Sequence, residues 1–347
     1  MIPGQGNVNK SMEGFPMKKI LNSTANYVDE CLDGMCSSHP EYYVQPVPRV
    51  IARARKASDG KVGIVTGGGS GHLPIFTGYV GKGLLDAAAI GDVFASPTPA
   101  QIMETIKQAD HGAGVLQLYG NYGGDLMNFD IADEMLELER DTPITTVVLA
   151  DDIASAPLAE REKRRGVAGM VYAFKIAGAA AERMASLDEV TRIAQKTADN
   201  CYSLGMALTP CIVPQAGKPT FTLADDEMEM GMGIHGETGI WRDKLKPADV
   251  IVDEMVDRLL ADCQLKTGAR VSVLVNSLGA TPVEELYIMY RRLKSRFDEK
   301  KITIVMPLVG RYATSMEMAG ASITLCVLDD ELEGLLKDPA DCAFLKV

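Results

Sequence analysis

The sequence predicts an α/β protein with two α/β domains, each built from a mixed β-sheet flanked by helices. Short β-branched runs alternate with amphipathic helical patterns along the whole chain, and this alternation is typical of sheets layered against helices. The length of 347 residues is more than one compact core usually supports, and it therefore favours two domains over one.

Residues 17–200 are expected to form the N-terminal domain, which contains a Gly-rich loop. Residues 1–16 are polar and Gly-rich without an apolar segment, so a disordered extension is expected there rather than a signal peptide. Apolar runs predict strands at 62–66, 115–119 and 144–150. Helical patterns separate and follow them at residues 99–110, 130–139, 167–185 and 188–199.

Residues 201–347 are expected to form the C-terminal domain, with strands at 207–213, 271–277, 302–308 and 322–328. Residues 249–263 predict an amphipathic helix, because apolar side chains recur on one of its faces. The run Thr281-Pro282-Val283-Glu284 has the spacing of a capping box and predicts that another helix begins with Pro282 at its first position.

The composition excludes several classes of protein. The chain has 35 Lys and Arg residues against 47 Asp and Glu residues, which gives a net charge of −12. This excess repels nucleic acid and anionic membrane surfaces, and no uninterrupted run of about 18 apolar residues is present to cross a bilayer. Seven cysteines without a C-x-x-C pair indicate reduced thiols and a cytoplasmic protein.

The first candidate site segment is Thr66-Gly67-Gly68-Gly69-Ser70-Gly71-His72, which follows a predicted strand. Its glycines allow backbone N–H groups to approach a ligand closely, and a tight turn after the strand explains them equally well. The segment matches neither a Walker A loop nor the G-x-S-x-G motif. His72 favours a functional site, because it places a titratable ring beside exposed backbone donors.

The second candidate segment is Asn121-Tyr122-Gly123-Gly124-Asp125, which follows the predicted strand at 115–119. Asp125 is a candidate general base for a hydroxyl group. Its spacing favours the simpler interpretation, in which the carboxylate caps the following helix.

The third candidate segment is Gly231-Met232-Gly233-Ile234-His235-Gly236-Glu237. Glycines surround His235, so little packing is expected around its ring, and a turn with an exposed histidine is as well supported as a functional residue. The other histidines lie at positions 39, 72 and 111, and His39 and His111 are expected to be solvated. The histidines and cysteines are too far apart in the sequence to predict a metal site. Two glycine-flanked histidines and one aspartate indicate covalent or acid–base chemistry on a small polar molecule.

These segments resemble the substrate-binding subunit of the dihydroxyacetone kinase family. The resemblance continues in order over about residues 17–330. The further motifs that carry it are residues 91–99, Arg164-Arg165-Gly166-Val167-Ala168, residues 217–229, residues 275–282 and Thr314-Ser315-Met316.

The resemblance implies roles for the candidate residues. His235 is expected to attach to the keto carbon of dihydroxyacetone or a related short ketose as a hemiaminal. The family's substrate-binding segment corresponds to Gly69, Ser70, Gly71 and His72, with His72 assisting proton transfer. Asp125 is expected to act on the hydroxyl that is phosphorylated. The implied activity is that of a dihydroxyacetone (glycerone) kinase-type phosphotransferase subunit, and covalent attachment would fix a small, flexible substrate in one orientation.

The resemblance also implies partners. The family's nucleotide-binding part is an all-helical domain that holds Mg-bound nucleotide, and this chain has no room for it after the second α/β half. We therefore expect no cofactor on this chain and a separate nucleotide-binding subunit. In bacterial systems a phosphotransferase-system protein serves as phosphoryl donor, and homologous subunits form homodimers.

Two positions depart from the family pattern. Leu73 stands where many members have Glu after the motif histidine, and Gly120 stands where many have Lys before the Asn-Tyr motif. Both changes remove charge beside the expected pocket, and they leave two alternatives open: a subunit specific for a four-carbon ketose such as erythrulose, and a non-catalytic ketose-binding co-activator. Retention of His235, His72 and Asp125 favours a kinase subunit over the co-activator, because a sensor has less need of a base.

Overall fold

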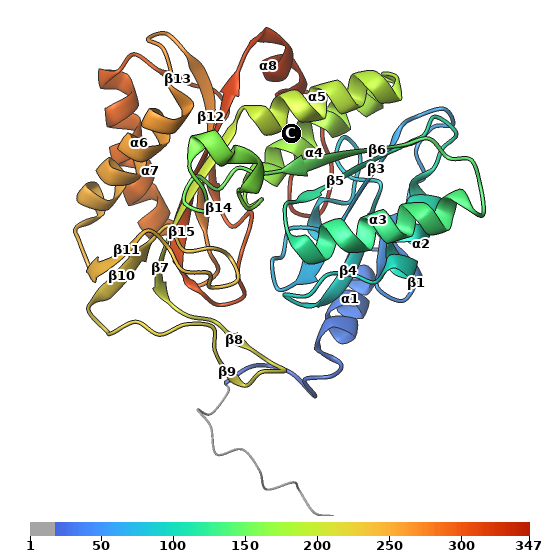
Figure 1. Ribbon diagram of the computed structural model, residues 1–347, viewed down its shortest axis with the longest axis horizontal. Helices are drawn as coiled ribbons and strands as arrows, with labels where there is room; N and C mark the ends of the chain where they lie inside the picture. Colours follow the sequence, from blue (N-terminus) through green and yellow to red (C-terminus); the bar gives the residue numbers. More distant parts are fainter. Residues whose placement is uncertain (1–17) are drawn as a thin grey trace, which may run out of the picture.

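The computed structural model describes residues 18–347 and contains two large β-sheets surrounded by helices (Figure 1). The predicted α/β class, with mixed sheets flanked by helices, is therefore confirmed. The extension expected at residues 1–16 lies outside the described residues. The strands of the first sheet end at Leu149 and those of the second begin at Cys201, and the domain division after residue 200 stays a prediction.

The first sheet has six strands in the order β1-β2-β4-β3-β5-β6. The antiparallel pairs are β1 with β2 and β2 with β4, whereas β4, β3, β5 and β6 are mutually parallel. The carboxyl ends of these four strands therefore lie at one edge of the sheet, which is the edge where α/β proteins bind ligands. The strands are Tyr43–Val47 (β1), Val50–Arg53 (β2), Gly63–Ser70 (β3), Ala87–Val93 (β4), Val115–Gly120 (β5) and Ile144–Leu149 (β6).

The second sheet has the order β11-β10-β7-β15-β12-β13, and β14 pairs with β12 as well. Its neighbours are antiparallel except where β12 meets β13 and β14. A separate hairpin joins β8 to β9. These strands are Cys201–Thr209 (β7), Ile212–Val213 (β8), Lys218–Pro219 (β9), Glu227–Met230 (β10), Trp241–Lys244 (β11), Arg270–Ser277 (β12), Thr303–Ile304 (β13), Leu308–Gly310 (β14) and Ala319–Leu328 (β15).

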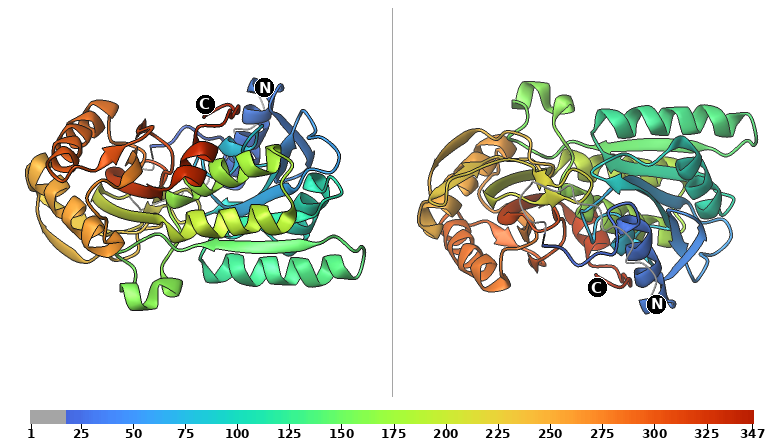
Figure 2. Two further views of the ribbon diagram at one scale, coloured as in Figure 1. Left: turned by 90° about the horizontal axis from the view of Figure 1, so that it is seen from above. Right: turned by 90° about the horizontal axis from the view of Figure 1, so that it is seen from below.

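The helices cover both sheets and fill the space between them. Helices α2 and α3 lie at one end of the molecule and α6 and α7 at the other (Figure 2). Helix α4 contacts β3 and β5 of the first sheet and β7 and β15 of the second. The helices are Tyr27–Ser38 (α1), Pro99–Ala109 (α2), Gly123–Glu137 (α3), Gly169–Glu182 (α4), Leu187–Asp199 (α5), Ala248–Cys263 (α6), Val283–Glu299 (α7) and Asp330–Leu336 (α8), with 3₁₀ turns at Thr77–Tyr79 (η1) and Leu158–Lys163 (η2).

Helix α4 is buried on every side, because all its residues from Gly169 to Ala181 are buried. A helix that is apolar all round belongs in a core, and the largest apolar cluster of the described residues includes α4 together with side chains of both sheets. Within it, the buried Lys175 donates to the Leu335 carbonyl at 2.8 Å. Helix α4 therefore fixes the two sheets against each other.

Several local predictions were wrong. The strand expected at 207–213 begins earlier, at Cys201, and that at 302–308 is split into β13 and β14. Helix α7 begins at Val283 with Pro282 as its N-cap and no side-chain cap. The Thr281 hydroxyl instead donates to the Gly320 carbonyl at 2.7 Å, which ties the start of α7 to β15. His111 is not solvated: its side chain is 11% exposed and lies 3.7 Å from the Asp86 carboxylate.

Candidate functional site

The fold brings His72 and His235 into direct contact. Their Nε2 atoms are 3.0 Å apart, and their rings meet edge to face with centroids 4.8 Å apart. His72 follows the end of β3, where Gly71 has a φ of 105° that turns the chain. His235 lies in the loop after β10, which the positive φ of Gly231 and Gly236 folds back on itself.

His72 is held by the segment that precedes β15. Its Nδ1 atom is 2.7 Å from the Thr314 carbonyl, and the Met316 amide donates to the Gly71 carbonyl at 2.7 Å. Because a carbonyl only accepts, His72 Nδ1 carries the hydrogen. The ring stacks on Phe94 at 4.9 Å, and burial lowers the pKa of His72 to about 3. The Nε2 atom of neutral His72 is therefore a hydrogen-bond acceptor.

His235 is held by Glu237. The Nδ1 atom of His235 is 2.9 Å from Glu237 Oε1, and the backbone N–H of His235 donates to Glu237 Oε2 at 2.9 Å. Burial alone would raise the pKa of Glu237, but the hydrogen bond from His235 and the charges of His235 and Arg165 lower it to about 2. Glu237 is therefore ionised and His235 Nδ1 carries a hydrogen.

One proton must lie between the two Nε2 atoms. Both Nδ1 hydrogens are already donated, to Thr314 and to Glu237, and two bare nitrogen lone pairs do not approach to 3.0 Å. A hydrogen bond across this contact therefore needs a third ring hydrogen, shared between His72 and His235, and the Glu237 carboxylate lies 2.9 Å from the same pair. Two imidazoles in such contact can serve as a nucleophile and its proton acceptor.

The ring of His235 is well packed, contrary to the prediction from its glycine neighbours. Tyr122 stands edge-on to it at 4.9 Å and Phe94 at 5.1 Å. The side chain nevertheless stays 25% exposed. Aromatic rings therefore orient the His235 ring and leave part of it accessible, which suits a residue that contacts a small molecule.

Asp125 does not cap α3. The helix begins at Gly123 with Tyr122 as N-cap, and Asp125 lies in its first turn, so the interpretation that spacing favoured is wrong. The residue is 7% exposed, and among residues 18–347 its Oδ1 atom has no hydrogen-bond partner. Burial raises the pKa of Asp125 to about 6, although Ser96 and the charge of His235 oppose the shift. A buried carboxylate with an unused oxygen is suited to accept a proton.

The glycine run is mostly strand rather than loop. Strand β3 extends through Ser70, and glycines are needed because their neighbours leave no room for side chains. A Cβ on Gly68 would lie 2.1 Å from the Phe76 ring, and one on Gly69 would lie 2.7 Å from the Ala95 nitrogen. Only Gly71 turns the chain toward His72. The assignment of Gly69, Ser70 and Gly71 to substrate binding stays a prediction.

The sequence interpretation missed five residues that shape the site. Their roles depend on contacts between segments far apart in the chain. Two of the five stood in the candidate site segments and the other three in motifs that carry the family resemblance, but none was given a role. Phe94 has an unusual φ of 57°. The missed residues are Phe94, Tyr122, Arg165, Glu237 and Thr314.

Residues 18–347 contain no group of three or more His, Cys, Asp or Glu side chains arranged to hold a metal ion. Among the same residues, no helix combines the length and the apolar character needed to cross a membrane.

Comparison with known proteins extends these observations. A relative from Listeria innocua, the dihydroxyacetone-binding subunit of PTS-dependent dihydroxyacetone kinase 1, is 46% identical over 94% of this chain and 99% of its own length. An L-erythrulose kinase from Pectobacterium atrosepticum is 41% identical over 95% of this chain, which spans 56% of that protein.

Two solved structures are similar as well. The dihydroxyacetone kinase of C. freundii in complex with AMP-PNP and Mg²⁺ has a TM-score of 0.84 and 32% identity, and the match covers 95% of this chain and 61% of that one. A dihydroxyacetone kinase operon co-activator has a TM-score of 0.83 and 34% identity, covering 90% of this chain and 96% of the other. Residues 33–344 match the Dak1 domain, and the chain therefore belongs to the dihydroxyacetone kinase family as a subunit of the dihydroxyacetone-binding (DhaK) type.

Proposed function

We propose that this chain is the ketose-binding subunit of a dihydroxyacetone kinase, with the substrate attached to His235 and phosphorylated at a terminal hydroxyl beside Asp125. The observation that carries the proposal is the 3.0 Å contact between His72 and His235, which pairs a nucleophile with a proton carrier. The substrate named for the Listeria relative supports dihydroxyacetone as the ketose.

In the proposed reaction His72 accepts the Nε2 proton of His235 as the ketone enters, and because burial keeps the pKa of His72 low, His72 holds that proton only until the carbonyl oxygen takes it. The Nε2 lone pair of His235 then forms a bond to the keto carbon while the carbonyl π electrons move to its oxygen. His72 returns its proton to that oxygen, so the adduct is a hemiaminal. The positive charge ends on the His235 ring, where the Glu237 carboxylate lies 2.9 Å from Nδ1. Glycerol has no carbonyl and cannot react in this way.

Asp125 then accepts the proton of the terminal hydroxyl as the oxygen of that hydroxyl attacks the phosphoryl group. We propose that the phosphoryl group comes from Mg-bound nucleotide on a partner subunit, which a phosphotransferase-system protein recharges. The PTS-dependent designation of the Listeria relative supports this arrangement. A homodimer, as the family resemblance implies, and a cytoplasmic location, as the cysteine usage indicates, complete the proposal.

Carbon-13 NMR tests the covalent step. When [2-¹³C]dihydroxyacetone is added, the signal of the keto carbon should move to the tetrahedral region and titrate with protein. The adduct should be absent in His235→Ala and present in His39→Ala, which removes a half-buried histidine. A ketone signal that stays unshifted at saturating wild-type protein would contradict the proposal.

The co-activator similarity favours a second candidate, a ketose sensor without phosphoryl transfer. Asp125 argues for the kinase subunit, because an adduct alone needs no buried carboxylate. Purified nucleotide-binding subunit and phosphoryl donor distinguish the two candidates. The kinase subunit should yield sugar phosphate that Asp125→Asn abolishes, whereas a sensor should form the adduct and yield none.

A further inference from the structure

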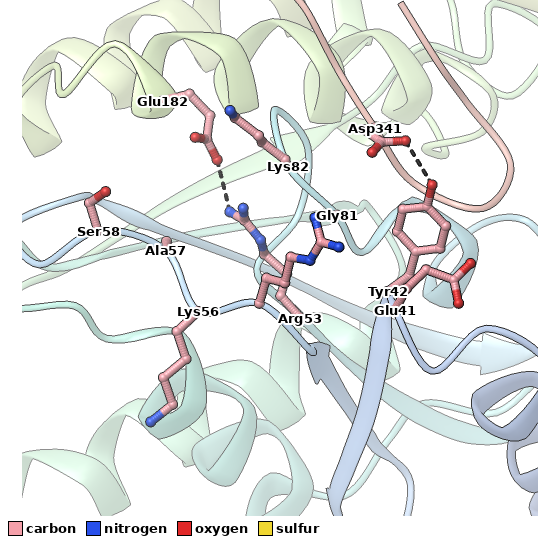
Figure 3. A pocket seen from close by; sticks show the side chains of 11 residues that line it. Glu41, Tyr42, Arg53, Lys56, Ala57, Ser58, Gly81, Lys82, Glu182 and Asp341 are labelled. Atoms are coloured by element: carbon pink, nitrogen blue, oxygen red, sulfur yellow. Dashed lines mark hydrogen bonds and ion pairs between the residues drawn. The ribbon is translucent and has the colours of Figure 1, made fainter.

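A polar cavity of about 360 Å³ lies at the amino ends of β3 and β4, opposite the edge where His72 and Asp125 lie. Figure 3 shows its walls. They come from the end of β2 and the segment after it, the turn before β4, the end of α4 and the C-terminal segment. The lining residues are Glu41, Tyr42, Arg53, Arg55, Lys56, Ala57, Ser58, Gly81, Lys82, Glu182 and Asp341.

The floor of this cavity is fixed and its charges are balanced. The Arg53 guanidinium, 10% exposed, lies 2.9 Å from Asp86 and 2.8 Å from Glu182. Asp86 in turn is 2.6 Å from the buried Lys61 ammonium. On the far side, the Tyr42 hydroxyl donates to Asp341 at 2.8 Å, and Lys346 is 3.4 Å from the same carboxylate.

The rim is different, because its cations lack partners. Arg55, Lys56 and Lys82 are exposed, and none forms an ion pair within residues 18–347. Lys82, Glu182 and Arg53 line the same cavity, and the Lys56 side chain extends away from Glu182 in Figure 3. The protein has a net charge of −12, yet the cavity is lined by four cations against three carboxylates. This local excess of positive charge indicates a site for an anion.

We propose that this cavity binds a small phosphate monoester of a polyol or sugar. The guanidinium of Arg55 and the ammonium of Lys82 complement a phosphate dianion, with the Ser58 hydroxyl as a further donor. The cavity volume exceeds that of phosphate alone and leaves room for a short carbon chain. The lining carboxylates of Glu41 and Asp341 would accept hydrogen bonds from its hydroxyl groups.

Calorimetry at constant ionic strength tests the site, with inorganic phosphate, glycerol phosphate and glycerol as probes. Glycerol phosphate should bind more tightly than phosphate, and glycerol should not bind. Arg55→Ala and Lys82→Ala should each weaken binding about tenfold, whereas Lys244→Ala, at a distant exposed ion pair, and His235→Ala should not.

Three results would overturn the anion site: equal affinity in all variants, complete displacement by chloride, or a rise in the monomer fraction of Arg55→Ala without any phosphate binding. The last result would mean that a second copy of the chain covers the cavity. Because the site lies away from His235, failure here leaves the proposed function intact.

A separate set of contacts lies behind the candidate site. Asp152, whose side chain is 4% exposed, pairs with Arg165 at 2.7 Å, and Arg165 lies 3.7 Å from Glu237 Oε2. Gly233 makes room for this arrangement, because a Cβ there would lie 2.2 Å from Glu237 Oε2 and 2.5 Å from the Arg165 guanidinium. The two sides of the carboxylate therefore face Arg165 and His235.

We infer that Asp152 and Arg165 are positioning residues that hold Glu237, and through it His235, in the orientation needed for attack. This inference rests on the proposed function. A buried ion pair is rigid only when both partners are satisfied, and Asp152 also accepts the Ala154 N–H at 3.0 Å. Without Arg165, Glu237 would keep its negative charge but lose its fixed direction.

Nitrogen-15 NMR of His235 without ketose tests the positioning role, so failure of the proposed function cannot mimic a negative result. In Arg165→Ala the hydrogen on Nδ1 should no longer be fixed, and the ring signals should show exchange between tautomers. With ketose present the adduct population should fall about tenfold, and Arg165→Lys should restore part of it.

Arg183→Ala, which breaks an ion pair at 2.6 Å with Asp338 on the surface, is the matched control and should change neither readout. If Arg165→Ala left the tautomer of His235 fixed, or changed only the unfolding temperature, the positioning role would be wrong.

Discussion

His72 and His235 lie 163 positions apart in the chain, yet their Nε2 atoms are 3.0 Å apart. Each ring already donates its Nδ1 hydrogen, to Thr314 and to Glu237 respectively. The contact therefore contains a single shared proton. In the proposed reaction a ketone takes the place of His72 beside His235 Nε2, and His72, whose pKa is lowered by burial, passes the proton that it accepts to the carbonyl oxygen.

Replacement of His72 by Asn should slow formation of the ketose adduct without abolishing it. The nucleophile His235 remains, but the positioned acid is lost, and such acids contribute about 100-fold or more. The rate is measured by stopped-flow mixing of ketose followed by rapid quench and intact-mass detection. His39→Asn is the control. Adduct formation at the wild-type rate in His72→Asn would show that solvent supplies the proton.

Asp125 should limit activity at low pH. Its pKa is raised to about 6 by burial, and only the ionised carboxylate accepts a proton. Phosphorylation should therefore fall tenfold for each pH unit below about 6. Asp133→Asn is a matched control on the same helix, since burial also raises the pKa of Asp133 to about 6. The Asp133→Asn variant should show the same fall in phosphorylation rate at low pH. If that fall disappeared in Asp133→Asn, the pH dependence would come from Asp133 and not from Asp125.

The same shift predicts that Asp125 destabilises the fold at neutral pH. The folded pKa of about 6 is above the unfolded value of about 3.9. The ionised group therefore opposes folding fully above pH 6 and not at all below pH 4. Asp125→Asn should raise the free energy of unfolding by up to about 3 kcal/mol at pH 8, and the gain should vanish near pH 4. Urea unfolding at both pH values measures it, and a gain that is independent of pH would refute the assignment.

The fold class and the three site segments could be predicted from the sequence, because they depend on local patterns of residues. Short apolar runs marked the central strands β3, β5 and β12. Glycine-rich segments contained Gly71, Gly231 and Gly236, where the chain has a positive φ. Helix α4 was recognised by its length and apolar character. The short strands β13 and β14 were merged, because the bend at Met306 that separates them leaves no periodic signal.

The remaining features are set by tertiary contacts. The sequence around Asp125 is the same as that expected for an aspartate that caps a helix. Its environment is set instead by His235, 110 positions later in the chain, whose charge acts on the Asp125 carboxylate. The sequence alone predicted that His111 is solvated, whereas the fold places its ring 3.7 Å from the Asp86 carboxylate. The stacking of Phe94 on His72 likewise depends on how two loops of the first sheet meet. Such contacts join segments far apart in the chain, and the hydrophobic periodicity of a sequence predicts only local structure.

Gly120 should influence which ketose is accepted. A Cβ at this position would lie 3.2 Å from the Gly166 carbonyl, 3.3 Å from the Tyr122 ring and 3.4 Å from Met170 Sδ. Tyr122 would have to shift, and it stands edge-on to His235. Gly120→Lys should therefore lower kcat/KM for erythrulose relative to dihydroxyacetone several-fold, a change of about 1 kcal/mol.

Gly120→Ala separates the steric effect from the charge of Lys. If the side chain acts through Tyr122, the Ala variant should reproduce most of the change in preference. Equal efficiencies on the two ketoses in wild type and in both variants would eliminate Gly120 as a determinant of specificity.

Asp151 should hold the segment that carries Arg165. It is fully buried and accepts hydrogen bonds from the Val167 N–H at 2.9 Å and the Gly169 N–H at 2.7 Å. Asp151→Ala leaves both donors unsatisfied in the core and should lower the free energy of unfolding by about 3 kcal/mol or more. Asp151→Asn keeps one acceptor and should lose less.

Amide hydrogen exchange distinguishes this local effect from general destabilisation. In Asp151→Ala the amides of Val167 and Gly169 should exchange faster than those of α6, whose core is separate. Asp188→Ala, at an exposed position in the first turn of α5, should leave them unchanged. Uniform acceleration across both helices would mean that Asp151 contributes only to global stability, whereas selective acceleration would show that this carboxylate anchors the strand-to-helix connection on which the orientation of Arg165 depends.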